Sequence, residues 1–252
     1  MEDIKAVTRE KATRFYRTYY VPNNAVVVVA GKFDEPSTLA AIDERYASIP
    51  ASASLPTTSI PTERAPGGQI RTQVSRPVPA DRMVIGFASP SFGHPDRAAF
   101  EIMNQILTGG PSSRLYSRLV VESQLASSVN GDVAPTKDAG LFALWTQMTK
   151  GHTAKEGEAI IDQEIGQLST DLVDDPDLVK AKNRLETGFW AQLSSSEGKA
   201  EQLGQFEITT GDFRNLLTRA DQYARVTAAD VQRVTREYLG RGRSVVVATA
   251  KP

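Results

Sequence analysis

Cysteine is absent from this chain of 252 residues, and histidine occurs only twice. Without cysteine the chain can form no disulfide, use no thiol nucleophile and bind no metal through sulfur. Zinc sites usually draw three or four ligands from His, Cys and carboxylates. The two histidines, His94 and His152, are far apart in the sequence, so we expect no metal-binding residue and no cofactor in this chain.

A surplus of charge and long apolar runs are lacking too. Lys and Arg together number 29 and Asp and Glu 30, so the formal net charge is −1. Binding to nucleic acid or to an anionic membrane surface usually goes with an excess of basic residues. A membrane-spanning helix needs an apolar run of about 20 residues. We therefore expect no nucleic-acid partner and no membrane span.

Both histidines have structural explanations. His94 lies in the sequence Phe-Gly-His-Pro-Asp and is expected to be an exposed loop residue. His152 precedes Thr153 and Glu156, whose spacing is that of a capping box at a helix start. The acidic run Asp174–Asp177 also fits a helix start, because carboxylates stabilise the positive end of a helix.

The common catalytic motifs are absent as well. His-x-x-Glu-His and Gly-x-Ser-x-Gly do not occur, and Gly109-Gly110 lies between two helical patterns rather than after a strand, unlike a phosphate loop. We therefore expect no catalytic residue in this chain.

What is present is the pattern of an α+β domain. Two strand-like runs come first, then a helical corner, two more strands, a long helical stretch broken near two turns, and a closing strand. The strands are expected at Gln69–Val74, Arg82–Ala88, Ala126–Val133, Gly140–Thr149 and Val245–Thr249, with helices over Thr153–Tyr238. This order predicts a two-layer sandwich, a mainly antiparallel sheet with helices on one face.

The first fifty residues show a different pattern of predicted helices and strands. A helix begins after Thr8, the apolar run Ala25–Ala30 predicts a strand buried on both faces, and Pro36–Tyr46 predicts a second helix. One buried strand without a neighbour leaves backbone groups unpaired. We therefore expect this strand to pair with another part of the molecule or with a second copy. Residues 1–49 are interpreted as the incomplete tail end of a preceding α+β domain, residues 50–68 as a linker, and residues 69–252 as the main domain.

The most informative segment is Gly109–Leu119, Gly-Gly-Pro-Ser-Ser-Arg-Leu-Tyr-Ser-Arg-Leu, a tight helix–helix corner. Together with three other segments it resembles the insulinase/pitrilysin-type zinc metallopeptidases, which include the mitochondrial processing peptidase. The matching segments, in order along the chain, are Phe15–Ala25 with the valine run after it, Ile106–Tyr116, Asp138–Phe142 and Val226–Val231.

This resemblance implies a clamshell of two similar α+β domains, of which this chain supplies the non-catalytic second one. The family carries His-x-x-Glu-His on a helix of the first domain, so zinc is expected only in an upstream domain outside this chain. In many members the second domain contributes an arginine and a tyrosine to the substrate. Val120 and Ser127 occupy those two positions here, so the substrate-binding residues stay unknown.

The expected function is therefore the inactive portion of a zinc metallopeptidase, which walls the substrate chamber and helps to bind extended peptide. The parent protein is expected to be a zinc metalloendopeptidase, whereas this chain alone is expected to be inactive. The alternative is an inactive interaction or scaffold subunit that pairs with a separate active peptidase subunit. Expected partners are a peptide or unfolded polypeptide and a zinc-bearing peptidase domain, in a homo- or hetero-dimer. The resemblance also suggests a periplasmic location.

Overall fold

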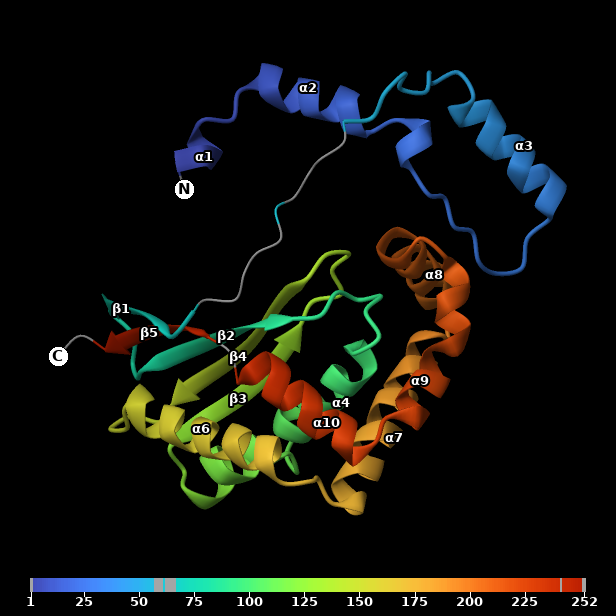
Figure 1. Cartoon of the computed structure of the whole chain (residues 1–252). Coiled ribbons are helices and arrows are strands. Elements are labelled where there is room, and N and C mark those ends of the chain that lie inside the picture. Colours follow the sequence, from blue (N-terminus) through green and yellow to red (C-terminus); the bar gives the residue numbers. More distant parts are fainter. Residues whose placement is uncertain (1, 57–60, 62–66, 241, 251–252) are drawn as a thin grey trace.

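One five-stranded sheet organises the main domain of the computed structural model, which describes residues 2–56, 61, 67–240 and 242–250 (Figure 1). The strands are β1 (Ile70–Arg76), β2 (Arg82–Ser89), β3 (Ala126–Val133), β4 (Gly140–Met148) and β5 (Ser244–Ala250). Their order across the sheet is β1-β5-β2-β4-β3. Only the β1–β5 pair is parallel, which confirms the predicted mainly antiparallel sheet.

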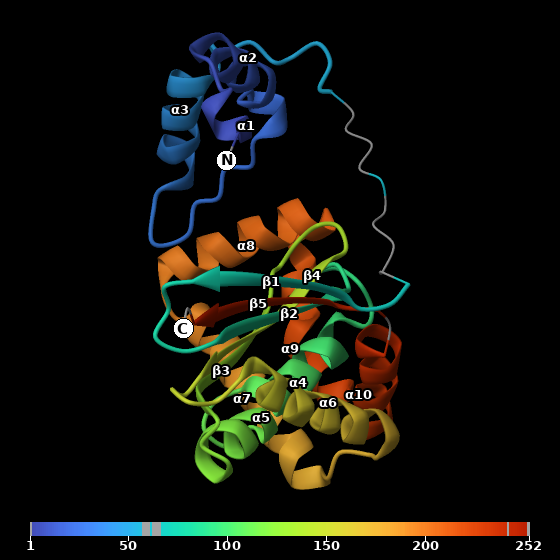
Figure 2. The ribbon, with the colours of Figure 1, turned by 90° about the vertical axis from the view of Figure 1, so that its left-hand side faces the viewer.

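Helices cover one face of this sheet, which confirms the predicted α+β sandwich (Figure 2). The helices of the main domain are α4 (Arg97–Thr108), α5 (Arg114–Tyr116), α6 (Ala154–Thr170), α7 (Asp175–Gln192), α8 (Ser196–Thr210), α9 (Arg219–Arg225) and α10 (Ala228–Val234). Two π-helical turns, η2 (Ser117–Glu122) and η4 (Thr235–Leu239), continue α5 and α10, and a 3-10 turn, η3 (Phe213–Thr218), precedes α9.

The two faces of the sheet differ sharply in burial. Along β4, Phe142 and Leu144 point to the helices and are fully buried, whereas Leu141 and Trp145 point the other way and are 56% and 53% exposed. Alternation of this kind follows from the two-residue period of a strand. The core therefore lies between the sheet and its helices.

Capping residues determine where two helices begin, as the sequence predicts. The Thr153 side chain accepts from the Glu156 amide, and Glu156 accepts from the Thr153 amide at 2.6 Å, so the capping box that begins α6 is confirmed. Asp174 caps α7 by accepting from the Asp177 amide at 2.8 Å, which confirms the role of the acidic run.

The first fifty residues form α1 (Glu2–Lys5), α2 (Arg9–Tyr19), the 3-10 turn η1 (Pro22–Asn24) and α3 (Glu35–Tyr46). The helix predicted after Thr8 is confirmed, and so is the one predicted over Pro36–Tyr46. Neither α2 nor α3 has a buried residue. The linker predicted over residues 50–68 lies partly outside the described residues. Its described positions carry no helix or strand, and the predicted domain boundaries stay predictions.

The strand predicted at Ala25–Ala30 is wrong for this chain. The structure has no strand over these residues, which pair with no described strand, and Val26 and Val27 are 50% and 60% exposed. A strand is stabilised by hydrogen bonds to a neighbouring strand. In this sheet β5, β2 and β4 each have a strand on both sides already, so the segment has no interior position to occupy. The predicted pairing within the molecule is therefore also wrong. Near α8, Val28 lies over Gly204, and Gly31, just after the segment, lies against Ser196.

Candidate functional site

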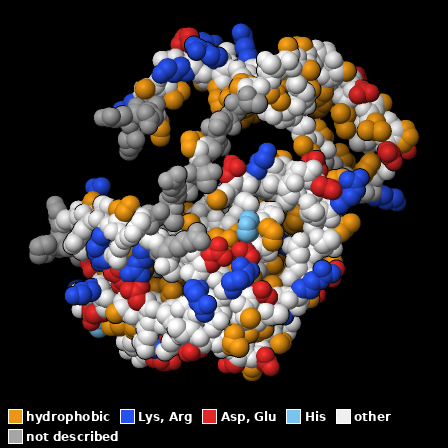
Figure 3. All heavy atoms as spheres, in the orientation of Figure 1, with side chains coloured by type: hydrophobic (Ala, Val, Ile, Leu, Met, Phe, Trp, Pro, Cys, Tyr) orange, Lys and Arg blue, Asp and Glu red, His pale blue; other side chains and the backbone are white. Residues whose placement is uncertain are grey.

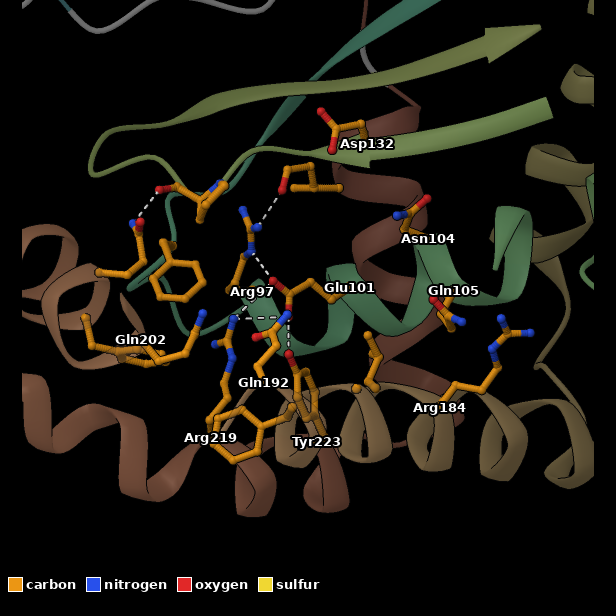
Figure 4. A pocket seen from close by; sticks show the side chains of 18 of the residues that line it. Arg97, Glu101, Asn104, Gln105, Asp132, Arg184, Gln192, Gln202, Arg219 and Tyr223 are labelled. Atoms are coloured by element: carbon orange, nitrogen blue, oxygen red, sulfur yellow. Dashed lines mark hydrogen bonds and ion pairs between the residues drawn. The ribbon is translucent and has the colours of Figure 1, made fainter. Parts of the chain in front are cut away.

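A cavity of ≈ 420 Å³ opens where α4, α7, α8 and α9 meet the end of β3 (Figure 4). It is hollowed between helices that are distant in sequence, so tertiary packing positions its lining. Its floor is an ion cluster, its walls carry side-chain amides, and one edge is the last part of an edge strand. We take it as the candidate functional site because it combines depth with converging polar groups.

The floor is organised by one carboxylate, that of Glu101 on α4. Arg97 Nε donates to Glu101 Oε1 at 2.6 Å, and Arg219 Nη2 donates to both carboxylate oxygens at 3.0 Å. The Tyr223 hydroxyl donates to Oε2 at 2.6 Å. Arg97 and Arg219 are only 2% and 4% exposed, so these ion pairs are shielded from water. The cluster ties α4 to α9 across more than a hundred residues of sequence.

The guanidinium groups of Arg97 and Arg219 share the single carboxylate of Glu101. These three groups together carry a net positive charge, which neighbouring groups stabilise. The Phe92 ring centroid lies 4.7 Å from the Arg219 guanidinium carbon and 5.4 Å from that of Arg97. Stacking of this kind stabilises a desolvated cation. Arg97 also donates to the carbonyls of Val133 and Ala134, at 2.8 and 3.0 Å.

Tyr223 is held as a hydrogen-bond donor at this floor. Burial is the main cause that raises the pKa of its hydroxyl, and the negative charge of Glu101 raises it further. The hydroxyl therefore keeps its proton in the physiological range, and its bond to the carboxylate persists there.

Amide side chains form the walls. Asn104 donates to the Gly131 carbonyl at 3.3 Å, and Gln205 donates to the Pro135 carbonyl at 3.1 Å. The side chains of Gln105, Gln192 and Gln202 line the same cavity, and within the described part of the chain they make no hydrogen bond. An amide offers both donors and acceptors. The donors and acceptors of these three side chains are therefore available to hydrogen-bond with a ligand in the cavity.

The strand edge beside the cavity is partly occupied. β3 is an edge strand, and the Gly131 and Val133 carbonyls turn away from β4 to accept from Asn104 and Arg97. A Cβ added at Gly131 would lie 2.1 Å from Asn104 Oδ1, so glycine is required for α4 to approach this closely. At this end of β3, side chains of α4 take the place that an added strand would fill.

The rim connects the cavity with the corner at Gly109–Leu119. Gly110 has φ +96°, and a Cβ there would lie 2.8 Å from both terminal nitrogens of Arg184 on α7. The Arg184 guanidinium therefore rests over the corner backbone at the cavity rim (Figure 4), and it makes no ion pair within the described part of the chain. The corner contributes to the site because Gly110 leaves room for the Arg184 side chain. Arg114 and Tyr116 do not line the cavity.

The positions singled out from the sequence lie elsewhere. Val120 is half-buried in η2 and packs against the main core. Ser127 is exposed at the start of β3, and its hydroxyl donates to the Gln147 carbonyl at 3.2 Å. Neither residue lines the cavity. Sequence reasoning missed Glu101, Arg219 and Tyr223. The spacing Arg97–Glu101 is a helical ion-pair signal, but nothing in the sequence joins it to α9.

The histidines take the structural roles that the sequence predicts. His94 lies in a loop, where its Nδ1 accepts from the Asp96 amide at 3.1 Å, and His152 Nδ1 lies 3.5 Å from Glu156. Among the described residues no three side chains of His, Asp or Glu are grouped to hold a metal ion. The expected absence of zinc stays a prediction. No helix in the described ranges is long and apolar enough to cross a membrane.

Comparison with known proteins identifies the family. The peptidase M16 inactive domain matches residues 6–185. An uncharacterized zinc protease of Mycobacterium leprae is 26% identical over 243 residues, which cover 96% of this chain and 54% of that protein. A probable mitochondrial-processing peptidase subunit beta of Arabidopsis thaliana is 23% identical over 94% of this chain and 46% of its own length.

A solved structure shows the same fold. The crystal structure of a protease from Helicobacter pylori superposes with a TM-score of 0.91 at 23% identity, covering 99% of this chain and 60% of that one. The chain spans about half the length of the curated relatives it matches. It belongs to the peptidase M16 inactive-domain family, the insulinase/pitrilysin-type family that its sequence resembles.

Proposed function

We propose that this chain is the non-catalytic portion of a zinc metallopeptidase, that it forms one wall of the substrate chamber, and that it binds an extended polypeptide in the α4/α7/α8 cavity. One observation carries the proposal. The cavity presents three amide side chains, Gln105, Gln192 and Gln202, without hydrogen-bond partners in the described part of the chain.

Amide side chains suit a polypeptide ligand. Each one can donate to a backbone carbonyl and accept from a backbone amide, and neither interaction depends on the ligand's side chains. The volume of ≈ 420 Å³ lies in the range of ligand pockets and accommodates a short stretch of chain. Binding by strand addition is less favoured at this end of β3, because Arg97 and Asn104 already use the outward carbonyls.

In this proposal the catalytic step belongs to a zinc-bearing domain outside the chain. The described residues then supply binding and enclosure, while the metal and its general base act elsewhere. The chain alone would neither cleave peptides nor take up zinc stoichiometrically. A periplasmic location remains part of this proposal.

A second candidate function is a scaffold subunit that pairs with an active peptidase without touching its substrate. The Arabidopsis relative is named as one subunit of a peptidase, which favours this reading. The two functions differ in one property, because only the first requires the cavity to bind polypeptide.

Binding of a permanently unfolded polypeptide separates them. Fluorescein-labelled, reduced and carboxymethylated α-lactalbumin is titrated with the chain while fluorescence anisotropy is recorded. The double variant Gln105→Leu/Gln202→Leu is expected to bind about tenfold more weakly, because two hydrogen bonds of about 1 kcal/mol or less each are lost. Gln167→Leu, at an exposed position of α6 away from the cavity, is expected to bind as the wild type does. Absence of binding, or equal binding by the double variant, contradicts the proposal, and absence of binding favours the scaffold.

A further inference from the structure

A cationic side chain lies between two hollows of the surface. Arg184 of α7 lines the cavity described above, and it also lines a second hollow that is formed by α7 residues alone. Gly188, one turn further along α7, borders both hollows too. The second hollow continues along α7 past Lys180 to Pro176. A polypeptide that left the cavity at this end would therefore pass over the Arg184 guanidinium.

Two glycines leave room for the Arg184 and Gln105 side chains to lie side by side. A Cβ added at Gly110 would lie 2.8 Å from both terminal nitrogens of Arg184, and one added at Gly109 would lie 2.4 Å from the side-chain amide nitrogen of Gln105. Because the two glycines are adjacent in the chain, the guanidinium and the amide lie close together at one end of the cavity (Figure 4). Both groups donate hydrogen bonds. The corner backbone therefore carries two neighbouring donors.

Arg184 has no partner of opposite charge within the ranges that the structure describes. Other arginines of the helices do have one, since Arg114 pairs with Asp177 and Arg233 with Asp96. On the face of the main domain that Figure 3 shows, basic side chains likewise lie beside acidic ones. The residues one turn away on α7, none of them acidic, are Lys180, Ala181, Thr187 and Gly188. In the described chain the guanidinium donors are therefore available to a ligand.

A guanidinium with free donors and a neighbouring amide suit a carboxylate. The terminal nitrogens of arginine match the two oxygens of a carboxylate, and such charge-assisted hydrogen bonds are about twice as strong as neutral ones. The Gln105 amide supplies a further donor beside them. Arg184 lies on α7 and is a different position from Val120 in η2, which stands where the family resemblance expects an arginine.

We propose that Arg184 and Gln105 bind a carboxylate of the polypeptide that occupies the cavity, so that the chain prefers polypeptides that carry one at this point. The proposal rests on the proposed function, because its ligand is the polypeptide of that function. The carboxylate belongs to an Asp or Glu side chain or to the C-terminus of the polypeptide, and the two sources share the same chemistry.

The preference depends on where the carboxylate lies in the cavity. Two acidic residues, Asp132 of β3 and Glu201 of α8, also line the cavity and would repel a carboxylate placed beside them. Figure 4 shows Asp132 on β3, on the side of the cavity away from Arg184. The test therefore uses peptides with a single carboxylate rather than highly acidic ones.

Competition measures how much one carboxylate raises the affinity of a peptide for the chain. Acetylated peptides of about 16 residues, built from Gly, Ser and Ala so that they stay unfolded, compete with the labelled α-lactalbumin. One carries a single central Glu and an amidated C-terminus, the second a free C-terminus and no Glu, and the third no carboxylate. We expect at least one of the first two to bind about tenfold more tightly than the third, because only a carboxylate forms charge-assisted hydrogen bonds with Arg184. Tighter binding by the first peptide identifies a side chain as the source, and tighter binding by the second identifies the C-terminus.

Arg184→Gln is expected to remove this preference, because the replacement has no charge and no pair of terminal nitrogens. Arg225→Gln is the matched control and should keep the preference, since Arg225 is also exposed on a helix but lines neither hollow. The readout is the ratio of two affinities within one variant. A general loss of binding or of stability therefore does not imitate the expected result.

Three outcomes contradict the proposal, and they separate it from the proposed function. Equal binding of the three peptides by the wild type overturns the carboxylate site and leaves the proposed function intact, since the peptides still bind. A preference that survives in Arg184→Gln overturns the site as well, because another cation then holds the carboxylate. If neither the labelled α-lactalbumin nor any peptide binds, the proposed function fails and the carboxylate site fails with it.

Discussion

At the scale of single residues, the stability of the site depends on Glu101. Its two oxygens accept from Arg97, Arg219 and Tyr223, three side chains that are nearly buried. Removing one partner from a buried ion pair is strongly destabilising, because the remaining charge keeps its desolvation cost without compensation. Here a single substitution would leave two guanidinium groups in that condition.

Glu101→Gln is therefore expected to lower the free energy of unfolding by about 3 kcal/mol or more, measured by urea denaturation. The matched control is Glu122→Gln, whose side chain is 62% exposed and pairs with Arg118 on the surface. That change should fall within roughly 0.5 kcal/mol of the wild type. Similar losses from both variants would show that the buried cluster contributes no more than a surface pair.

Some residue roles were predicted because the partner was close in sequence and the spacing formed a known motif. Thr153 and Glu156 are three positions apart, and the capping box follows from that spacing alone. Glu101 and Tyr223 are 122 positions apart, so no local pattern could bring them together. The cavity was missed for this reason, since every one of its helices is placed by tertiary packing.

At the scale of elements, the five strands of the sheet were predicted to within two residues. β3 has the predicted bounds, Ala126–Val133, because its turn signals are sharp on both sides. The segment Ala25–Ala30 has an equally strong pattern and still forms no strand in this chain. A strand pattern indicates that a segment is able to form a strand, but the strand forms only where a neighbouring strand is available to pair with it.

The corner between α4 and α5 allows an element-level prediction. Gly110 and Gly151 both have φ +96°, yet a Cβ would meet Arg184 only at Gly110 and open space at Gly151. Gly151→Ala should cost about 1 kcal/mol, the strain of a left-handed conformation. Gly110→Ala is expected to cost more and to displace Arg184. Thermal unfolding of both variants measures the difference in their stability. Equal melting temperatures would mean that the close approach of Arg184 to Gly110 adds nothing to the cost of the substitution.

At the scale of the whole molecule, burial is confined to one part of the chain. Both hydrophobic clusters draw all their buried residues from positions 83–247. In the first fifty residues, by contrast, α2 and α3 contribute none. Stability follows buried apolar area, so the main domain should not depend on the segment before it.

Deleting residues 1–68 is therefore expected to leave the melting temperature within about 3 °C of the full chain, because little buried area is lost. Calorimetry of the two chains measures this, and unfolding should stay a single cooperative transition. The complementary deletion, from Ser244 onward, removes the interior strand β5 and is expected to abolish folding. Each deletion removes a run of valines, but only the run in β5 is paired in the sheet. A large loss from the first deletion would place residues 1–68 within the folding unit of the main domain, contrary to the burial pattern.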